Sequence, residues 1–224
     1  MPGRKTPLIT DSIYHIFNRG VASMPIFLDE RHYWRCLDTL LYYQEESPKI
    51  RFSYFSRQQF LDKDKKPNKP KQHLVKIISY CFMPNHFHLL LEQSVDNGIS
   101  NFMSKFANSY TRYFNTKNKR IGPIFQGKFK SVLVETESQL LHLSRYIHLN
   151  PYSAGLAENI NQLDKYQYSS LPEYLHLTNT NYCQKDIVLS YFKQKNSYRN
   201  FVYDHADHQR NLQNIKKVML DFEE

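Results

Sequence analysis

The stretch that decides the fold is residues 83–92, which read MPNHFHLLLE. It follows an apolar run over residues 75–82 and continues as a second one, with a Pro-Asn turn between the two. Alternation along a β-strand places His86 and His88 on one face and Phe87 on the other. Two imidazoles side by side on a rigid strand can supply two ligands to one metal ion. The alternative is that the two histidines merely line a sheet edge.

The hydrophobic periods around this hairpin predict a β-α-β-β-α-β-α order. Ser100 is a plausible N-cap for the second helix. The order favours an α+β fold, a ferredoxin-like four-stranded antiparallel sheet with helices packed on it. Its first and third strands would be central and adjacent, which puts the histidines beside Tyr14 or His15. The predicted strands cover about residues 12–17, 75–82, 86–92 and 131–135, and the predicted helices about 29–46, 100–115 and 138–150.

The helix over 138–150 carries a second polar pattern. His142, Tyr146 and Asn150 are spaced i, i+4 and i+8, so they share one side of the helix. This helix could cross the histidine face and bring Tyr146 to a bound metal. Pro151 is predicted to end the helix, because a residue before proline resists the α conformation. By helical geometry His148 points elsewhere.

Composition places the chain among globular proteins that act away from membranes. Hydrophobic residues make up 41% of the 224 residues, but no apolar run approaches the roughly 20 residues of a membrane helix. No apolar signal core follows the basic N-terminus. The three cysteines are widely spaced and form no CxxC pattern, which favours a reducing cytoplasm over a disulfide framework or a structural zinc site.

The charge balance and the aromatic content modestly favour a nucleic-acid partner. The formal net charge is +9, and the chain contains 17 Tyr and 15 Phe. Basic charge suits a phosphate backbone, and aromatic rings suit unstacked bases. The alternative is a basic protein whose aromatic residues all belong to the core.

We predict a main domain over residues 1–172 and a helical C-terminal extension over 173–224. The charged stretch at about 61–73 is predicted to form a mobile basic loop within the main domain. Short helices are expected in the extension at about 184–194 and 206–222. Its Lys and Arg content suggests additional DNA contact, and the alternative is a solvated surface.

A metal held by two imidazoles can polarise a phosphodiester as a Lewis acid. A tyrosine nucleophile suits a strand-transfer enzyme, because a phosphotyrosine preserves the energy of the broken bond. Asn150, one turn after Tyr146, could add its side-chain oxygen to the metal. Imidazole and oxygen ligands together suit Mg²⁺ or Mn²⁺. Tyr110 and Tyr113 compete for the nucleophile role, but their aromatic helix favours core packing.

Four phrases in the sequence resemble the single-tyrosine HUH transposases, and within them the REP-associated tyrosine transposases. They are PNHFHLLLE, SYTRYFN, GPIFQGKFKS and SRYIHLNPYSAG, and the resemblance covers about residues 10–172. It implies that His86 and His88 bind the metal, that Asn150 is its third ligand and that Tyr146 is the nucleophile. Such enzymes cut single-stranded DNA beside a hairpin, form a 5′-phosphotyrosine and reseal the strand by attack of a 3′-OH.

The expected partner is therefore single-stranded DNA with a hairpin, with no membrane and no small-molecule substrate, bound by a monomer or a homodimer. The main alternative is a domesticated regulator that binds hairpins without cutting them. A two-histidine phosphodiesterase is disfavoured because the chain has one HxH and no second copy. For DNA binding the sequence suggests a set of mostly basic residues, namely Arg19, Lys117, Lys119, Arg120, Gln126, Lys128 and Lys130.

Overall fold

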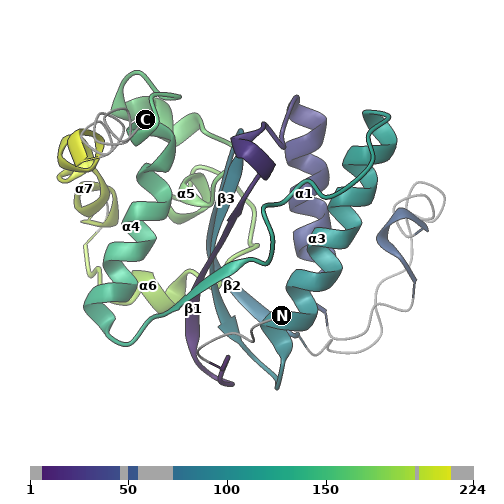
Figure 1. Cartoon of the computed structure of the whole chain (residues 1–224). Helices are drawn as coiled ribbons and strands as arrows, with labels where there is room; N and C mark the ends of the chain where they lie inside the picture. Colours follow the sequence, from purple (N-terminus) through teal and green to yellow (C-terminus); the bar gives the residue numbers. More distant parts are fainter. Residues whose placement is uncertain (1–6, 46–49, 55–72, 195–196, 213–224) are drawn as a thin grey trace.

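The computed structural model describes residues 7–45, 50–54, 73–194 and 197–212. Four strands form one antiparallel sheet in the order β2-β3-β1-β4, so the first and third strands are central and adjacent as predicted. Helices pack on both faces of this sheet (Figure 1). The strands are β1 (Ile13–Arg19), β2 (Val75–Met83), β3 (His86–Gln93) and β4 (Lys130–Leu133).

The helices occupy the connections that the hydrophobic periods predict. The α+β class and the ferredoxin-like sheet are thereby confirmed. Within the described residues, no helix is long and apolar enough to cross a lipid bilayer. The principal helices are α1 (Glu30–Tyr43), α3 (Gly98–Lys117) and α4 (Glu137–Ser153), followed by the shorter α5 (Leu171–Tyr174), α6 (Asp186–Leu189) and α7 (Ser197–Tyr203).

The two faces of the sheet divide the chain into a core side and a histidine side. Phe87 points toward α3, where its ring meets Phe106 at 5.6 Å between centroids. Figure 1 shows α1 and α3 together on one side of the sheet and α4 on the other. His86 and His88 point toward α4, because they alternate with Phe87 along β3. The predicted helix 138–150 therefore does cross the histidine face.

Segments that follow α4 in the chain cover the outer edge of β2. Ser170 donates its backbone N–H to the carbonyl of Tyr80, and Gln184 donates to that of Ile77. These bonds leave little of the edge available for pairing with another chain. The nine residues of β2 are almost all buried as a result.

Two helix boundaries differ from the prediction. Ser100 lies inside α3, and Asn97, in the left-handed region with φ 58°, precedes its first turn. Pro151 does not end α4, which continues to Ser153. The proline forfeits one backbone bond, but its carbonyl accepts from Leu156, and burial of the last turn holds the helical path.

The C-terminal extension contains shorter helices than expected. The helix predicted at about 184–194 is the single turn α6, and α7 lies in a segment for which no helix was expected. Residues 206–212 are helical as predicted, and the rest of that prediction lies outside the described residues. The basic loop predicted at about 61–73 also lies outside them, apart from residue 73.

Candidate functional site

The predicted site residues meet between β3 and α4. The rings of His86 and His88 lie 5.0 Å apart, centroid to centroid, nearly perpendicular to each other. The Tyr146 ring meets the His88 ring edge-on at 5.4 Å. Asn150 is hydrogen-bonded to the side chains of both Tyr146 and His86. The HxH strand and the tyrosine helix of one chain therefore come together in one cluster.

Each of the two histidines is bonded through its Nδ1. His86 Nδ1 lies 2.7 Å from Asn85 Oδ1, and His88 Nδ1 lies 2.9 Å from His15 Nε2. These contacts leave the Nε2 atom of each ring as the nitrogen for a metal ion. A metal-binding histidine typically donates its other N–H to such a partner, which fixes the ring and its tautomer. The pair thus has the bonding pattern of metal ligands.

Asn150 brings a side-chain amide oxygen to the cluster. Its Nδ2 donates to the backbone carbonyl of Tyr146 at 2.8 Å, and it is almost completely buried. Within the described ranges, no cluster of three or more His, Cys, Asp or Glu side chains is arranged to hold a metal ion. Two imidazole nitrogens and one amide oxygen form a donor set that suits Mg²⁺ or Mn²⁺, with further positions left for substrate oxygens and water.

Burial keeps these histidines neutral. It lowers the pKa of His86 to about 4, although its hydrogen bond with Asn150 acts in the opposite direction. Burial also lowers the pKa of His15 to about 4 and that of His88 well below its usual value. A neutral imidazole keeps the lone pair that a metal requires, so the cluster is ready for a cation at neutral pH.

The Tyr146 phenol is protonated in this environment. Burial raises its pKa, and the hydrogen bond with Asn150 opposes that shift. The residue as a whole is only partly buried. A cation nearby would favour the phenolate.

The competing tyrosine Tyr110 is fully buried. Its hydroxyl donates to the backbone carbonyl of Ile26 at 2.6 Å. His142 shares the polar stripe of α4, but its Nδ1 atom lies 2.6 Å from the Nη2 atom of Arg145. His148 is buried on the other side of α4, between Tyr198 and Ser170. The core position of Tyr110 and the orientation of His148 away from the polar stripe both agree with the predictions.

His15 is the residue of this cluster to which the sequence assigned no role. His15 lies on β1, two residues before Phe17, which pairs with His88 on β3. This register places His15, rather than Tyr14, on the histidine face, and its ring lies 6.2 Å from that of Tyr146. The alternation of β1 could have signalled its face, but its contact with His88 depends on the strand register.

Three of the suggested DNA-binding residues lie near the histidines. Arg19 pairs with His86 in the sheet and donates from its Nε to Gln126 Oε1 at 2.8 Å. Lys130 begins β4 beside Phe17 and is exposed. Arg19 also contributes to the lowered pKa of His86 through its charge. These side chains form a polar rim at one end of the cluster.

The remaining suggested residues lie at or beyond the C-terminal end of α3. Lys117 pairs with Asp29 at 2.8 Å, and Arg120 donates to the carbonyl of Pro123 at 2.9 Å. Lys119 and Lys128 are exposed on the connection that follows. The structure therefore does not gather the seven suggested residues into one patch.

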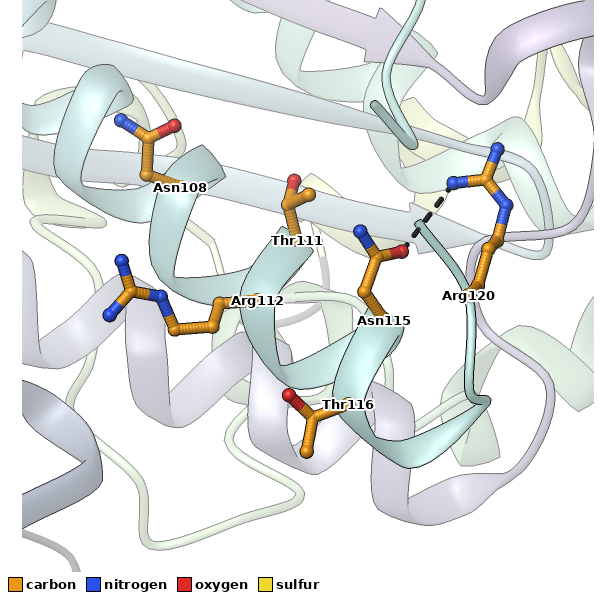
Figure 2. A pocket seen from close by; sticks show the side chains of 6 residues that line it. All are labelled: Asn108, Thr111, Arg112, Asn115, Thr116 and Arg120. Atoms are coloured by element: carbon orange, nitrogen blue, oxygen red, sulfur yellow. Dashed lines mark hydrogen bonds between the residues drawn. The ribbon is translucent and has the colours of Figure 1, made fainter. Parts of the chain in front are cut away.

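A polar hollow runs along the outer side of α3, away from the histidine cluster (Figure 2). Arg112 and Arg120 are its charged residues, and Arg120 Nη1 lies 3.4 Å from Asn115 Oδ1. No pattern in the sequence pointed to Arg112 as a functional residue. The hollow contains no acidic side chain and is lined by Asn108, Thr111, Arg112, Asn115, Thr116 and Arg120.

Comparisons with known proteins agree with this arrangement. Residues 48–150 match the family model Y1_Tnp, described as "Transposase IS200 like". The matched segment includes both histidines of β3, Tyr146 and Asn150. A comparison with curated protein sequences finds no match. The resemblance seen in the sequence is confirmed, and residues 48–150 are similar to the IS200-like transposases.

A solved structure shares the fold. It is described as "Structure of the REP associates tyrosine transposase bound to a REP hairpin". The TM-score is 0.50, and the match covers 82% of this chain and 98% of that one, at 12% sequence identity. The match extends past the family segment and supports the same four-stranded sheet with its helices.

Proposed function

We propose that this chain is a metal-dependent transposase that cuts and rejoins single-stranded DNA next to a hairpin. The observation that carries the proposal is the contact of Tyr146 and Asn150 on α4 with His86 and His88 on β3. The family match supplies the reaction class, and the hairpin in the similar solved structure suggests the form of the DNA. Residues 1–172 would form the catalytic domain, and residues 173–224 its extension.

The metal ligands would be His86 and His88 through Nε2 and Asn150 through Oδ1. A bound Mg²⁺ or Mn²⁺ would neutralise charge on the scissile phosphate. The two Nδ1 contacts, with Asn85 and His15, would hold the two imidazole rings in place as ligands through Nε2. His15 is then a positioning residue, because it acts on the metal site through His88.

Tyr146 would be the nucleophile. Its phenol oxygen forms a bond to the phosphorus while the bond from phosphorus to the 3′ oxygen breaks. The phenol loses its proton, and the released 3′ oxygen gains one, so no cofactor energy is consumed. Asn150 fixes the phenol through its side-chain contact with Tyr146. Attack by a 3′-OH on the phosphotyrosine reverses the step and rejoins a strand.

The DNA would reach the cluster over the rim formed by Arg19, Gln126 and Lys130. These side chains come from β1, from the connection after α3 and from β4, and they are exposed beside the histidine face. Arg19 and Lys130 would contact backbone phosphates. Lys117, Lys119, Arg120 and Lys128 would contribute at a greater distance from the cut.

A denaturing-gel assay tests this proposal. Labelled single-stranded hairpins from the DNA flanking the gene are incubated with Mg²⁺ or Mn²⁺ and with wild type, Tyr146→Phe or His88→Ala. We expect a covalent protein–DNA adduct and a 3′-OH fragment with wild type alone. Tyr110→Phe is the matched control, because it removes a buried phenol hydroxyl outside the cluster, and it should still form the adduct.

The second candidate is the domesticated regulator that binds hairpins without cutting them. Identical hairpin binding by wild type and both site variants, with no adduct from any of them, would favour this function. Adduct formation that survives Tyr146→Phe would contradict the assignment of the nucleophile. The intact cluster of His86, His88, Tyr146 and Asn150 supports the cutting enzyme.

A further inference from the structure

The side chain of Ile121 stands almost fully in solvent. Its exposed fraction is 95%, and the next most exposed large apolar side chain in the described part of the chain, Tyr54, reaches 57%. Single exposed aliphatic side chains are common on protein surfaces, so exposure alone identifies no site. The stiffness of the turn, the charge around it and its distance from the histidine cluster together point to a role for Ile121.

Hydrogen bonds close the turn that carries Ile121. Asn115, near the end of α3, donates from its Nδ2 to the carbonyl of Gly122 at 2.8 Å. Arg120 donates its backbone N–H to the carbonyl of Asn115 at 2.9 Å and its Nη1 to the carbonyl of Pro123 at 2.9 Å. These bonds tie both sides of the tip to the end of the helix. Ile121 therefore projects from a turn that is held in place.

The backbone on each side of Ile121 passes through the left-handed region. Lys119 has a φ of 50° and Gly122 a φ of 96°. Glycine adopts such a φ without the steric cost of a Cβ. A Cβ at Gly122 would meet nothing within 4 Å, so this side of the tip is open. The β-branched side chain of Ile121 is itself stiff at χ1, so the tip is preformed for contact with a ligand.

Positive charge surrounds the tip. Lys119 is exposed beside it, and Arg120 lines the polar hollow of α3 together with Arg112 and Asn115 (Figure 2). Residues 97–134 contain no Asp or Glu. Such a surface attracts phosphates, whereas an aliphatic side chain gains nothing from them. The combination suits a ligand that presents phosphates around an apolar face, and a nucleic acid with an exposed base is such a ligand.

The chain that follows the tip leads to the rim of the histidine cluster. Val21 donates its N–H to the carbonyl of Ile124 at 3.0 Å, and Gln126 donates to that of Arg19 at 2.8 Å. The step from Ile121 to Gln126 spans no more than about 18 Å at full extension. Adjacent nucleotides are about 3.4 Å apart along a stacked strand. DNA that lies on the rim therefore reaches Ile121 within roughly five nucleotides.

We infer that Ile121 is a wedge that packs on the face of a base where the duplex of the hairpin meets the single strand. This inference rests on the proposed function, because it takes the hairpin as the partner. Apolar side chains that insert into DNA partly unstack a base step. Unstacking costs least for a base that is already unpaired, as at such a junction. The wedge fixes where the duplex ends relative to the rim, and thus which stretch of single strand reaches Tyr146.

Hairpins that carry 2-aminopurine at successive positions across the junction test the wedge. The fluorescence of this base rises when its stacking on neighbouring bases is lost. Hairpins from the DNA flanking the gene are titrated, without added metal, with wild type, Ile121→Ser and Ile121→Leu. We expect wild type and Ile121→Leu to raise the fluorescence at one position of the junction, and Ile121→Ser to lose that rise. Leu177→Ser, at a position 54% exposed on the extension, is the control and should match wild type.

Hairpin affinity over a range of salt concentrations separates a base contact from a phosphate contact. Ile121→Ser should bind several-fold more weakly than wild type, with an unchanged slope of log affinity against log salt, because no charge is lost. Lys119→Ala is the comparison, and loss of one phosphate contact should lower its slope by about 0.9.

Each result decides for or against the wedge. Affinity and fluorescence equal to wild type in Ile121→Ser would overturn the inference, and so would a fluorescence rise that survives this substitution. A change in the sedimentation of DNA-free Ile121→Ser would assign the tip to a contact between two copies of the chain instead. Failure of wild type to bind any of the hairpins would refute the hairpin partner itself, and with it the proposed function.

Discussion

At the scale of single residues, the site depends on which ring nitrogen of His86 and His88 is hydrogen-bonded to a neighbouring side chain. His15 and Asn85 each contact the Nδ1 of a neighbouring histidine, so both Nε2 atoms are left for a metal ion. Neither contact is visible from the HxH motif, because one partner is the preceding residue of the turn and the other lies on a different strand. The alternation of β3 predicted the shared face of His86 and His88, and the register of β1 added His15 to it.

His15→Ala should weaken metal binding without removing a ligand. Loss of a partner of this kind typically reduces metal affinity by about 10- to 100-fold. Isothermal titration of Mn²⁺ into the DNA-free protein measures the effect, and exposed His205→Ala serves as the control. Wild-type Mn²⁺ affinity in His15→Ala would show that His88 keeps its orientation without this contact.

At the scale of elements, α4 differs most from its prediction. The sequence rules end it before Pro151, but the helix runs on because its last turn, including Pro151 and Tyr152, is buried. Ser100 fails as a cap for a related reason, since α3 begins at Gly98 and Ile99 donates its N–H to the side chain of Gln93. Local preferences predicted which elements exist, and tertiary contacts determined where they end.

The buried His148 on α4 predicts loss of stability in acid. Burial lowers its pKa to about 3, so the folded chain keeps it neutral while the unfolded chain protonates it below about 6.5. The unfolded state then binds more protons, and the free energy of unfolding falls as the pH drops. Between pH 7 and pH 5 this one group should cost about 2 kcal/mol.

Urea unfolding at both pH values measures this loss. His148→Gln removes the titrating group, so its stability should fall by about 2 kcal/mol less than that of wild type between pH 7 and pH 5. His208→Gln, at an exposed position, is the control and should follow wild type. An unchanged pH dependence in His148→Gln would mean that His148 is not held neutral in the folded chain.

At the scale of the whole molecule, positive charge is concentrated in one segment. Residues 97–134 contain seven Lys and Arg residues and neither Asp nor Glu. The segment runs from α3, with its polar hollow, through the connection that carries Gln126, and into β4 beside the histidine face (Figure 1). This segment links the hollow to the rim of the site, so we propose that bound DNA also contacts the hollow.

Arg112→Ala tests whether the hollow on α3 contacts DNA. Each phosphate contact that is lost should lower the slope of log affinity against log salt by about one. Hairpin binding measured over a range of salt concentrations should show this decrease, while Lys193→Ala, an exposed lysine on the extension, should leave the slope unchanged. Equal slopes for the two variants would exclude Arg112 from the DNA contact.

The sequence did not predict where the extension packs. Its packing on α4 depends on pairs such as Tyr198 with His148, which lie 50 residues apart in the chain. No periodicity links such pairs. The four transposase phrases, by contrast, lie within short segments, and this is why the family and the cluster of Tyr146 with His86 and His88 could be predicted while the packing of the extension on α4 could not.

The central claim is that Tyr146 becomes covalently attached to DNA. The most direct measurement is mass spectrometry of the protein–DNA adduct after nuclease and trypsin digestion. We predict a nucleotide phosphate on the peptide that begins after Arg145, attached at Tyr146. A phosphate carried by Tyr152 of the same peptide, or by a peptide that contains Tyr110 or Tyr113, would contradict this account of the site.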